Sequence, residues 1–389
     1  MKTFDPFAPE VVDNPYPAYA EIRERTPCHY VAQHDLWLVT RFQDLTAVSK
    51  NHAVFSSTGG VGLEWKQRPM ISMYDPPEHT RLRRLVSGYF TPKAVAGLAQ
   101  RLEQRIDDLL GRMVEMGRAD LVADLAEPLS LGIIADLMGV PDADRANFRK
   151  WADCVMSELS GGVDAEGAAR DEASRREFVT YLKELTAHRH RHLDPNAVDI
   201  ISRLVAANQN EALTHSEVTA FCVLLLVAGF EPTVNGIANT ALAMLEHPDQ
   251  ARLVVHDPSL LSGAIEEALR YDTPVQAFFR NTRTATEISG VAVPAHAKVM
   301  IHFGAANRDA RRYEDPDRFL VTRRIDENLV FGAGVHYCLG APLARLQLNT
   351  LGRVALRKVR AVRRAGAVER ASTLLFRGIR HFPVEVLAR

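Results

Sequence analysis

Residues 331–340 read FGAGVHYCLG, and they lead directly into APLAR at residues 341–345. Pro342 stands where proline suits the first turn of a helix, so the sequence predicts a helix that begins just after Cys338. A cysteine at a helix N-terminus faces unpaired backbone N–H groups and the positive end of the helix dipole. We therefore expect these groups to lower the pKa of Cys338 and to stabilise its thiolate.

The glycines around Cys338 favour a flat ligand. Gly332, Gly334 and Gly340 would let the backbone approach a macrocycle closely. A thiolate can ligate haem iron, and its electron density favours O–O cleavage. The alternative is a buried free cysteine in a glycine-rich turn, which is the commoner role of an arbitrary cysteine. The spacing F-x-x-G-x-x-x-C-x-G, however, would arise by chance in a chain of this length about once in a thousand.

This segment resembles the haem-binding loop of the cytochrome P450 family. The resemblance covers nearly the whole chain and implies that Cys338 is the axial ligand of haem b, with Phe331, Gly332 and Gly340 beside the cofactor. It also implies the fold of that family, which is mainly α with small β sheets and forms a triangular helical prism around a buried haem. The expected activity is that of a monooxygenase.

Length and composition agree with one globular unit. No Gly/Ser-rich or Pro-rich linker divides the 389 residues, so we expect a single domain over 1–389. The 47 basic and 48 acidic residues nearly balance, which argues against a nucleic-acid partner or a polybasic membrane anchor. The N-terminus has no signal-peptide pattern, and the longest apolar run, Phe221–Phe230, is about half of a membrane span. We expect a cytoplasmic monomer.

Apolar residues at three- and four-residue spacing predict helices over most of the chain. The clearest are 95–113, 145–159, 170–192, 217–246 and 259–271. Strand patterns are short and lie toward the two ends of the chain. They cover 29–31, 37–39, 287–288, 291–293, 298–301 and 384–386.

A charged pair and a set of cations support the haem reading. Glu267 and Arg270 lie one helical turn apart on one face. The resemblance makes them the E-x-x-R element that locks the cysteine loop, with Arg318 as the third member; Arg323 is a less suitable alternative. The two haem propionates demand cationic donors. The resemblance assigns them to a set of four residues, in which the first two are four positions apart: His79, Arg83, Arg280 and His336.

The segment 224–233 matches the oxygen-activating helix of the family. Ala228 and Gly229 are small enough to leave room for dioxygen over the iron. Glu231 is an acid in an apolar helix, which is expensive unless it is paired or functional, and the resemblance makes it a proton donor. The next position is usually a threonine but here is Pro232, and Thr233 lies about 100° further round the helix.

Proline removes the N–H that would bond the carbonyl of Ala228, so the helix should kink or admit water there. We expect a proton relay through Glu231 with ordered water or a substrate hydroxyl. A peroxide-driven or otherwise atypical oxidation is the alternative, and tolerance of Pro232 at lower coupling efficiency is the simplest outcome. A non-catalytic haem-binding module is a third reading, but such a module needs no proton path.

Similarity to enzymes that hydroxylate or O-demethylate small aromatic acids and ethers predicts an apolar pocket. Its expected lining is Leu63, Val227, Ala228, Val275, Phe278 and Leu375. The arginine and serine with which such enzymes anchor a carboxylate are not evident, since Thr58, Glu64 and Val227 occupy those places. A neutral, phenolic or amine-bearing compound is therefore at least as suitable as a benzoate-like anion.

The sequence contains no flavin or nicotinamide fingerprint. Electrons must therefore come from outside, and we expect a ferredoxin and its reductase. The side of Cys338 would receive this partner, with Arg345 and Arg101 meeting its acidic surface.

Overall fold

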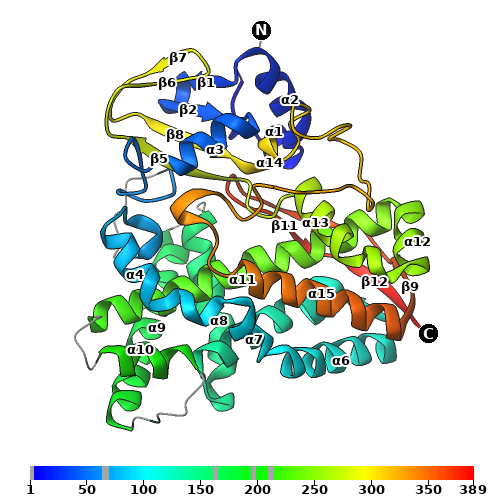
Figure 1. The fold of residues 1–389 in the computed structure, drawn as a ribbon. Coiled ribbons are helices and arrows are strands. Elements are labelled where there is room, and N and C mark those ends of the chain that lie inside the picture. Colours follow the sequence, from blue (N-terminus) through cyan, green and yellow to red (C-terminus); the bar gives the residue numbers. More distant parts are fainter. Residues whose placement is uncertain (1–3, 64–69, 161–164, 193, 195–198, 209–213) are drawn as a thin grey trace.

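The computed structural model describes residues 4–63, 70–160, 165–192, 194, 199–208 and 214–389. Helices make up most of it (Figure 1). They are α1 (Pro9–Asp13), α2 (Pro15–Arg25), α3 (Phe42–Lys50), α4 (Glu78–Ser87), α5 (Pro92–Ala96), α6 (Ala99–Met116), α7 (Glu127–Met138), α8 (Arg145–Ser160), α9 (Ala165–Arg191), α10 (Ile200–Asn208), α11 (His215–Glu246), α12 (Pro248–His256), α13 (Leu261–Tyr271), α14 (Phe303–Ala306) and α15 (Ala341–Lys358).

The strands form small sheets. They are β1 (Cys28–Val31), β2 (Leu36–Val39), β3 (Phe55–Ser56), β4 (Arg118–Asp120), β5 (Ala277–Thr282), β6 (Thr286–Ile288), β7 (Val291–Val293), β8 (Lys298–His302), β9 (Val359–Arg364), β10 (Glu369–Ser372), β11 (Arg377–His381) and β12 (Pro383–Ala388). The largest sheet has the order β1-β2-β8-β5-β3, in which only the β2–β8 pair is parallel. The others are β4-β12-β9, β10-β11 and β6-β7.

Three apolar clusters hold these elements together. The largest joins the helices around α11, including Leu102, Leu129, Leu204 and Leu226. Two smaller clusters lie against the five-stranded sheet, where the alternation of strand side chains directs Val299 into one and Met300 into the other. The helical part and the sheet part therefore each have buried apolar contacts, and Figure 1 shows the five-stranded sheet above α11.

α11 is the central helix. A Thr214–Glu217 capping box begins it, and it continues without interruption through Pro232. Residues 216–246 are long and apolar enough to cross a membrane by composition, but 61% of the most apolar window is buried inside the protein. The apolar surface of α11 is therefore used for core packing against α7, α9 and β11.

Most predicted elements are present, and the expectation of a mainly α protein with small sheets is confirmed. The predicted helix 95–113 is divided between α5 and α6 at Gly97–Leu98. The sequence did not predict β3, β4, β5 or β9 to β11. β5 is buried along most of its length, so its residues AFFRNT lack the alternation of a half-exposed strand.

Candidate functional site

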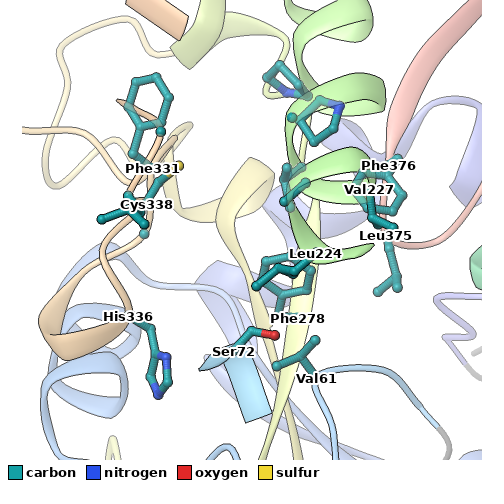
Figure 2. A pocket seen from close by; sticks show the side chains of 18 of the residues that line it. Val61, Ser72, Leu224, Val227, Phe278, Phe331, His336, Cys338, Leu375 and Phe376 are labelled. Atoms are coloured by element: carbon teal, nitrogen blue, oxygen red, sulfur yellow. The ribbon is translucent and has the colours of Figure 1, made fainter. Parts of the chain in front are cut away.

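A cavity of about 810 Å³ lies between α11 and the loop Phe331–Gly340, which we call the cysteine loop (Figure 2). The loop supplies one wall, including Cys338, and α11 supplies another, including Val227. The turn after β10 adds Leu375 and Phe376. Segments far apart in the sequence thus enclose one space that is large enough for a small-molecule site.

Backbone geometry fixes the cysteine loop. The N–H of Cys338 donates to the carbonyl of Phe331 at 2.8 Å and closes the loop. Gly332 and Gly334 have φ of 72° and 70°, a region that side chains rarely adopt. A Cβ on Gly334 would stand 2.3 Å from the carbonyl oxygen of Ser49 on α3. Gly340, by contrast, has an ordinary φ of −82°, so its smallness and not its backbone angle would matter here.

Cys338 occupies the predicted position before α15, and its side chain is open only to the cavity, where the surrounding protein withdraws it from bulk water. The surrounding protein raises the pKa of its thiol by burial, and the backbone N–H groups of Gly340 and Ala341, with Arg83, act in the opposite direction. The predicted effect of the helix N-terminus is therefore present, but the expectation of a lowered pKa is wrong for the chain by itself. Metal binding is what deprotonates such a ligand outright.

The four predicted propionate donors all line the cavity at the end formed by α4, β5 and the cysteine loop. The ring centroids of His79 and His336 are 4.4 Å apart. Arg83 donates to the carbonyl of Tyr337 at 2.6 Å. Burial lowers the pKa of Arg280 to about 10, that of His79 to about 4 and that of His336 to about 3. At neutral pH the two imidazoles are therefore uncharged hydrogen-bond donors, and the guanidinium groups of Arg83 and Arg280 require anionic partners.

Asp75 is a member of this cluster that sequence reasoning did not assign. Its carboxylate is 7% exposed and accepts hydrogen bonds from the Ser56 hydroxyl, the Ser57 N–H at 3.0 Å and Arg283 at 2.6 Å. Ser57 in turn contacts Nε2 of His336 at 3.1 Å. Burial would raise the pKa of Asp75, but these donors outweigh burial and hold it below its usual value. Asp75 thus connects β3, β5 and the cysteine loop.

Asp75→Asn should destabilise the fold by about 1–3 kcal/mol at neutral pH, because charged hydrogen bonds to buried donors are lost. The depressed pKa means that this stabilisation is present above the ordinary carboxyl pKa near 3.8 and disappears as the pH falls below it. Urea unfolding of both proteins over a pH series measures this. The two stability curves should converge in acid, and a constant gap at all pH values would contradict the assignment.

The Glu267–Arg270 pair forms as predicted, with both side chains 0% exposed and an Nε–Oε2 distance of 2.7 Å. The third member is Arg323, whose Nε donates to Glu267 at 3.1 Å. The prediction of Arg318 is wrong, because its side chain is 68% exposed and pairs with Asp315. Only the backbone of Arg318 takes part, because its carbonyl accepts hydrogen bonds from the side chains of Arg270 and Arg323. The side chain of Arg323 is therefore the one that points inward.

This triad reaches the cysteine loop through Asn307. Arg270 donates to the Asn307 carbonyl at 2.9 Å, and the Asn307 side-chain oxygen accepts the N–H of Leu329 at 2.8 Å. Leu329 lies two residues before the loop and its carbonyl accepts from Gly332. The charges of the triad therefore hold the entry of the loop in place.

Four of the five site residues predicted between positions 228 and 233 of α11 face the cavity. Ala228, Gly229, Pro232 and Thr233 line the cavity, whereas Glu231 is not among the lining residues. A Cβ on Gly229 would lie 3.1 Å from Ile134, so the glycine also permits close packing of α7. Pro232 does not interrupt the helix, but it has no N–H to donate to the Ala228 carbonyl.

Glu231 is the unusual acid in this segment. Its Oε2 is buried and has no hydrogen-bond partner among the described residues. Burial raises its pKa to about 7, and the side chain of Asn235, one turn further along α11, offsets part of this shift. A group with this pKa can both hold and release a proton near neutral pH.

All six residues predicted for the substrate pocket lie on the cavity wall. The lining also includes residues that the sequence did not single out, among them Val61, Ser72, Leu224 and Phe376 (Figure 2). Only the folded chain brings them together, since they come from four separate segments. Glu64, considered above as a possible polar neighbour, lies outside the described residues.

The donor set fits a haem. A cysteine sulfur stands in one wall, two arginines and two histidines gather at one end, and the rest of the wall is largely apolar. His79 Nδ1 is buried and without a partner in the described part of the chain, as expected of a donor that waits for a propionate oxygen. Cys338 would hold the iron, and the two arginines and two histidines would hold the propionates.

Comparisons with known proteins give a consistent result. The sequence pattern of the family described as Cytochrome P450 matches residues 168–358. The chain is 37% identical to "Cytochrome P450 107B1" of Saccharopolyspora erythraea over 90% of this chain and 89% of that protein. It is also 37% identical to "Vitamin D(3) 25-hydroxylase" of Pseudonocardia autotrophica, over 98% and 96% of the two chains. The crystal structure of CalO2 superposes with a TM-score of 0.91 at 32% identity, covering 99% of both chains.

Proposed function

The chain belongs to the cytochrome P450 family and is a monooxygenase of that class, and on this premise we propose that it hydroxylates or O-demethylates a neutral, largely apolar organic molecule of small to medium size. The proposed cofactor is haem b on Cys338, with O2 as co-substrate and a ferredoxin as electron donor. The observation that carries the substrate class is the distribution of charge around the cavity.

Charged side chains gather at one end of the cavity only. The basic side chains on its described wall are the guanidinium groups of Arg83 and Arg280 and the imidazoles of His79 and His336, all in the set that fits the propionates. Where α11 faces the β10–β11 turn, the lining is apolar and includes Val227, Leu375 and Phe376. A carboxylate bound there would lose its hydration without gaining a cation, which is unfavourable. A neutral substrate avoids this penalty.

A spin-state titration with a matched pair of probes tests the substrate class. 4-Methoxytoluene and 4-methoxybenzoate have similar shapes but differ in charge, and testosterone serves as a larger neutral probe. We expect neutral compounds to displace the distal water and shift the Soret band at concentrations at least about tenfold lower than the anion requires. Tighter binding of 4-methoxybenzoate would contradict the proposal.

When haem is bound, it supplies the chemistry that uses O2 and two electrons to oxidise the substrate. The protein supplies the sulfur ligand of Cys338, the cations that fix the propionates, and an apolar wall that excludes water from the substrate. Glu231 holds a proton at its carboxyl group beside this wall. Because Pro232 leaves the Ala228 carbonyl without its helical donor, that oxygen can accept a hydrogen bond from water or from a substrate hydroxyl.

Glu231→Gln should lower turnover by roughly 10²-fold, the smaller end of what general acid catalysis contributes. In the unaltered protein, turnover should fall as the pH rises through about 7, the pKa of Glu231. The variant should lack this pH dependence. Glu246→Gln, an exposed position at the other end of α11, is the matched control. An unchanged pH profile in Glu231→Gln would remove Glu231 from the proton path.

The same pKa has a consequence for stability. The pKa of Glu231 is raised above its ordinary value of 4.5. Its contribution to the free energy of unfolding is therefore greatest below pH 4.5 and is lost as the pH rises to about 7. The unaltered protein should therefore become less stable relative to Glu231→Gln across this range.

Pro232 favours a second candidate, a peroxide-driven oxidation. A position that offers neither a hydroxyl nor an N–H gives less help in delivering protons to dioxygen, whereas hydrogen peroxide already carries its protons. Turnover with ferredoxin, reductase and NAD(P)H should be compared with turnover in hydrogen peroxide, for the unaltered protein and for Pro232→Thr. Efficient turnover with peroxide alone, which Pro232→Thr reduces, would favour this second candidate.

The side of the protein nearest Cys338 is proposed as the docking face for a ferredoxin. Arg345, expected to meet the partner, is already paired with Glu266 at 2.6 Å, which reduces its attraction for an acidic surface. Arg101, at the start of α6, is exposed. Arg101→Glu should therefore weaken reduction more than Arg345→Gln does, and the difference should diminish in high salt. We further propose that the protein acts in the cytoplasm as a monomer with one domain.

A further inference from the structure

The C-terminal end of α9 carries alternating histidines and arginines, since residues 188–192 read HRHRH. His188 and His192 are four positions apart and therefore lie on the same side of the helix, one turn from each other. Their ring centroids are 4.7 Å apart. The N–H of His192 donates to the carbonyl of His188 at 3.0 Å, which continues the helical hydrogen-bond pattern through this turn. The backbone thus holds two imidazoles side by side.

Both imidazoles are exposed, and neither makes a hydrogen bond or an ion pair with another described residue. The two arginines between them are bonded elsewhere. Arg189 donates to the carbonyl of Gly139, just after α7, at 2.8 Å, and Arg191 donates to the carbonyl of Ala187 at 3.4 Å. The ring nitrogens of this pair are therefore available to a ligand that approaches from solvent.

We propose that His188 and His192 chelate a divalent transition-metal ion of the borderline class, represented by Zn²⁺, Ni²⁺ and Cu²⁺. Imidazole nitrogen is a preferred ligand of these ions. Two histidines four positions apart on a helix are also the spacing with which the H-E-x-x-H motif binds zinc. Mg²⁺ and Ca²⁺ prefer oxygen ligands, so they do not fit this pair. Water would complete the coordination, which makes the site weaker than one with four protein ligands.

The bound ion would stabilise the end of α9. The last carbonyls of a helix have no intrahelical donors, so the final turn is the part that most readily unwinds. An ion held by both side chains requires positions 188 and 192 to remain one helical turn apart, and it therefore favours the folded state by mass action. α9 packs against α8, α10 and α11, so this stabilisation extends to the helical part of the protein. The inference does not depend on the proposed function.

The test uses the untagged holoenzyme after dialysis against EDTA. NiCl₂ and ZnCl₂ are titrated calorimetrically into the unaltered protein, His188→Gln and His192→Gln, and MgCl₂ serves as the oxygen-preferring cation. His190→Gln is the matched control, because His190 is an exposed histidine of the same turn but lies about 200° round the helix from His188. Thermal unfolding of the same four proteins, with and without ZnCl₂, provides the second readout.

We expect one binding event for Ni²⁺ and Zn²⁺ that His188→Gln and His192→Gln each weaken at least about tenfold, because either change leaves a single imidazole without its chelating neighbour. His190→Gln should bind within about twofold of the unaltered protein. At a hundredfold excess of ZnCl₂ over its dissociation constant, the unfolding midpoint should rise by about 3 °C in the unaltered protein and in His190→Gln only.

Equal affinity of the unaltered protein, His188→Gln and His192→Gln would overturn the inference, as would an equal loss in His190→Gln. Binding of MgCl₂ with the same affinity as NiCl₂ would also contradict it, since an oxygen-preferring ion should not select an imidazole pair.

Discussion

Cys338→Ala is expected to abolish monooxygenase turnover, with a loss of about 10³-fold or more. Cys338 is the one cysteine among the described residues that line the cavity, and the described residues contain no group of three or more His, Cys, Asp or Glu side chains that could hold a metal instead. Loss of the thiolate removes the electron donation that favours O–O cleavage. A factor of 10³ corresponds to about 4 kcal/mol of lost transition-state stabilisation. Product formation with a saturating electron supply is the measurement.

Cys28→Ala is the matched control for this variant. Cys28 is also a free cysteine but is buried against the five-stranded sheet, away from the cavity. Its replacement should leave turnover per bound haem unchanged. If Cys338→Ala retained turnover comparable with the control, another residue would have to be the ligand.

Glu267→Gln should destabilise the protein by about 3–5 kcal/mol, because it leaves two arginine side chains without their buried counter-charge. Glu267 is 0% exposed and binds Arg270 and Arg323, and its Oε1 also accepts the N–H of Leu320 at 2.9 Å. Unfolding in urea, followed by circular dichroism, measures the change. Haem release should accelerate in the same variant, since the triad supports the cysteine loop through Asn307.

The two candidate arginines provide an internal comparison. Arg323→Gln should lower the free energy of unfolding by about 1.5–3 kcal/mol, the range for hydrogen bonds to charged groups. Arg318→Gln, at an exposed side chain, should change it by less than about 0.5 kcal/mol. A larger effect at Arg318 than at Arg323 would contradict the arrangement of the triad.

Local patterns made the cysteine loop and most helices predictable. The glycines of the cysteine loop, Cys338 itself and the start of α15 are contiguous in the sequence. The role of the loop could therefore be inferred without knowledge of the fold. The same holds for α11, whose apolar run and internal acid are local features. The four basic residues at 79, 83, 280 and 336 could be assembled only through the family resemblance, because they come from three separate segments.

Features that depend on the path of the chain were not predictable. Arg318 and Arg323 are only five residues apart, and nothing in the sequence tells which one turns inward; the turn at residues 318–322 decides it. Asp75 stands in a recognised segment, but its partners Ser56, Ser57 and Arg283 meet it only through the pairing of β3 with β5. The raised pKa of Cys338 arises from burial, which the helix-terminus argument does not contain.

The central claim is that the sulfur of Cys338 binds the iron of a haem in this cavity. The most direct measurement is the absorption spectrum of the purified, reduced protein after addition of carbon monoxide. Thiolate ligation predicts a strongly red-shifted Soret band that Cys338→Ser lacks. A Soret band at the ordinary position of nitrogen-ligated haem in the unaltered protein, or a red-shifted band that survives in Cys338→Ser, would contradict the account.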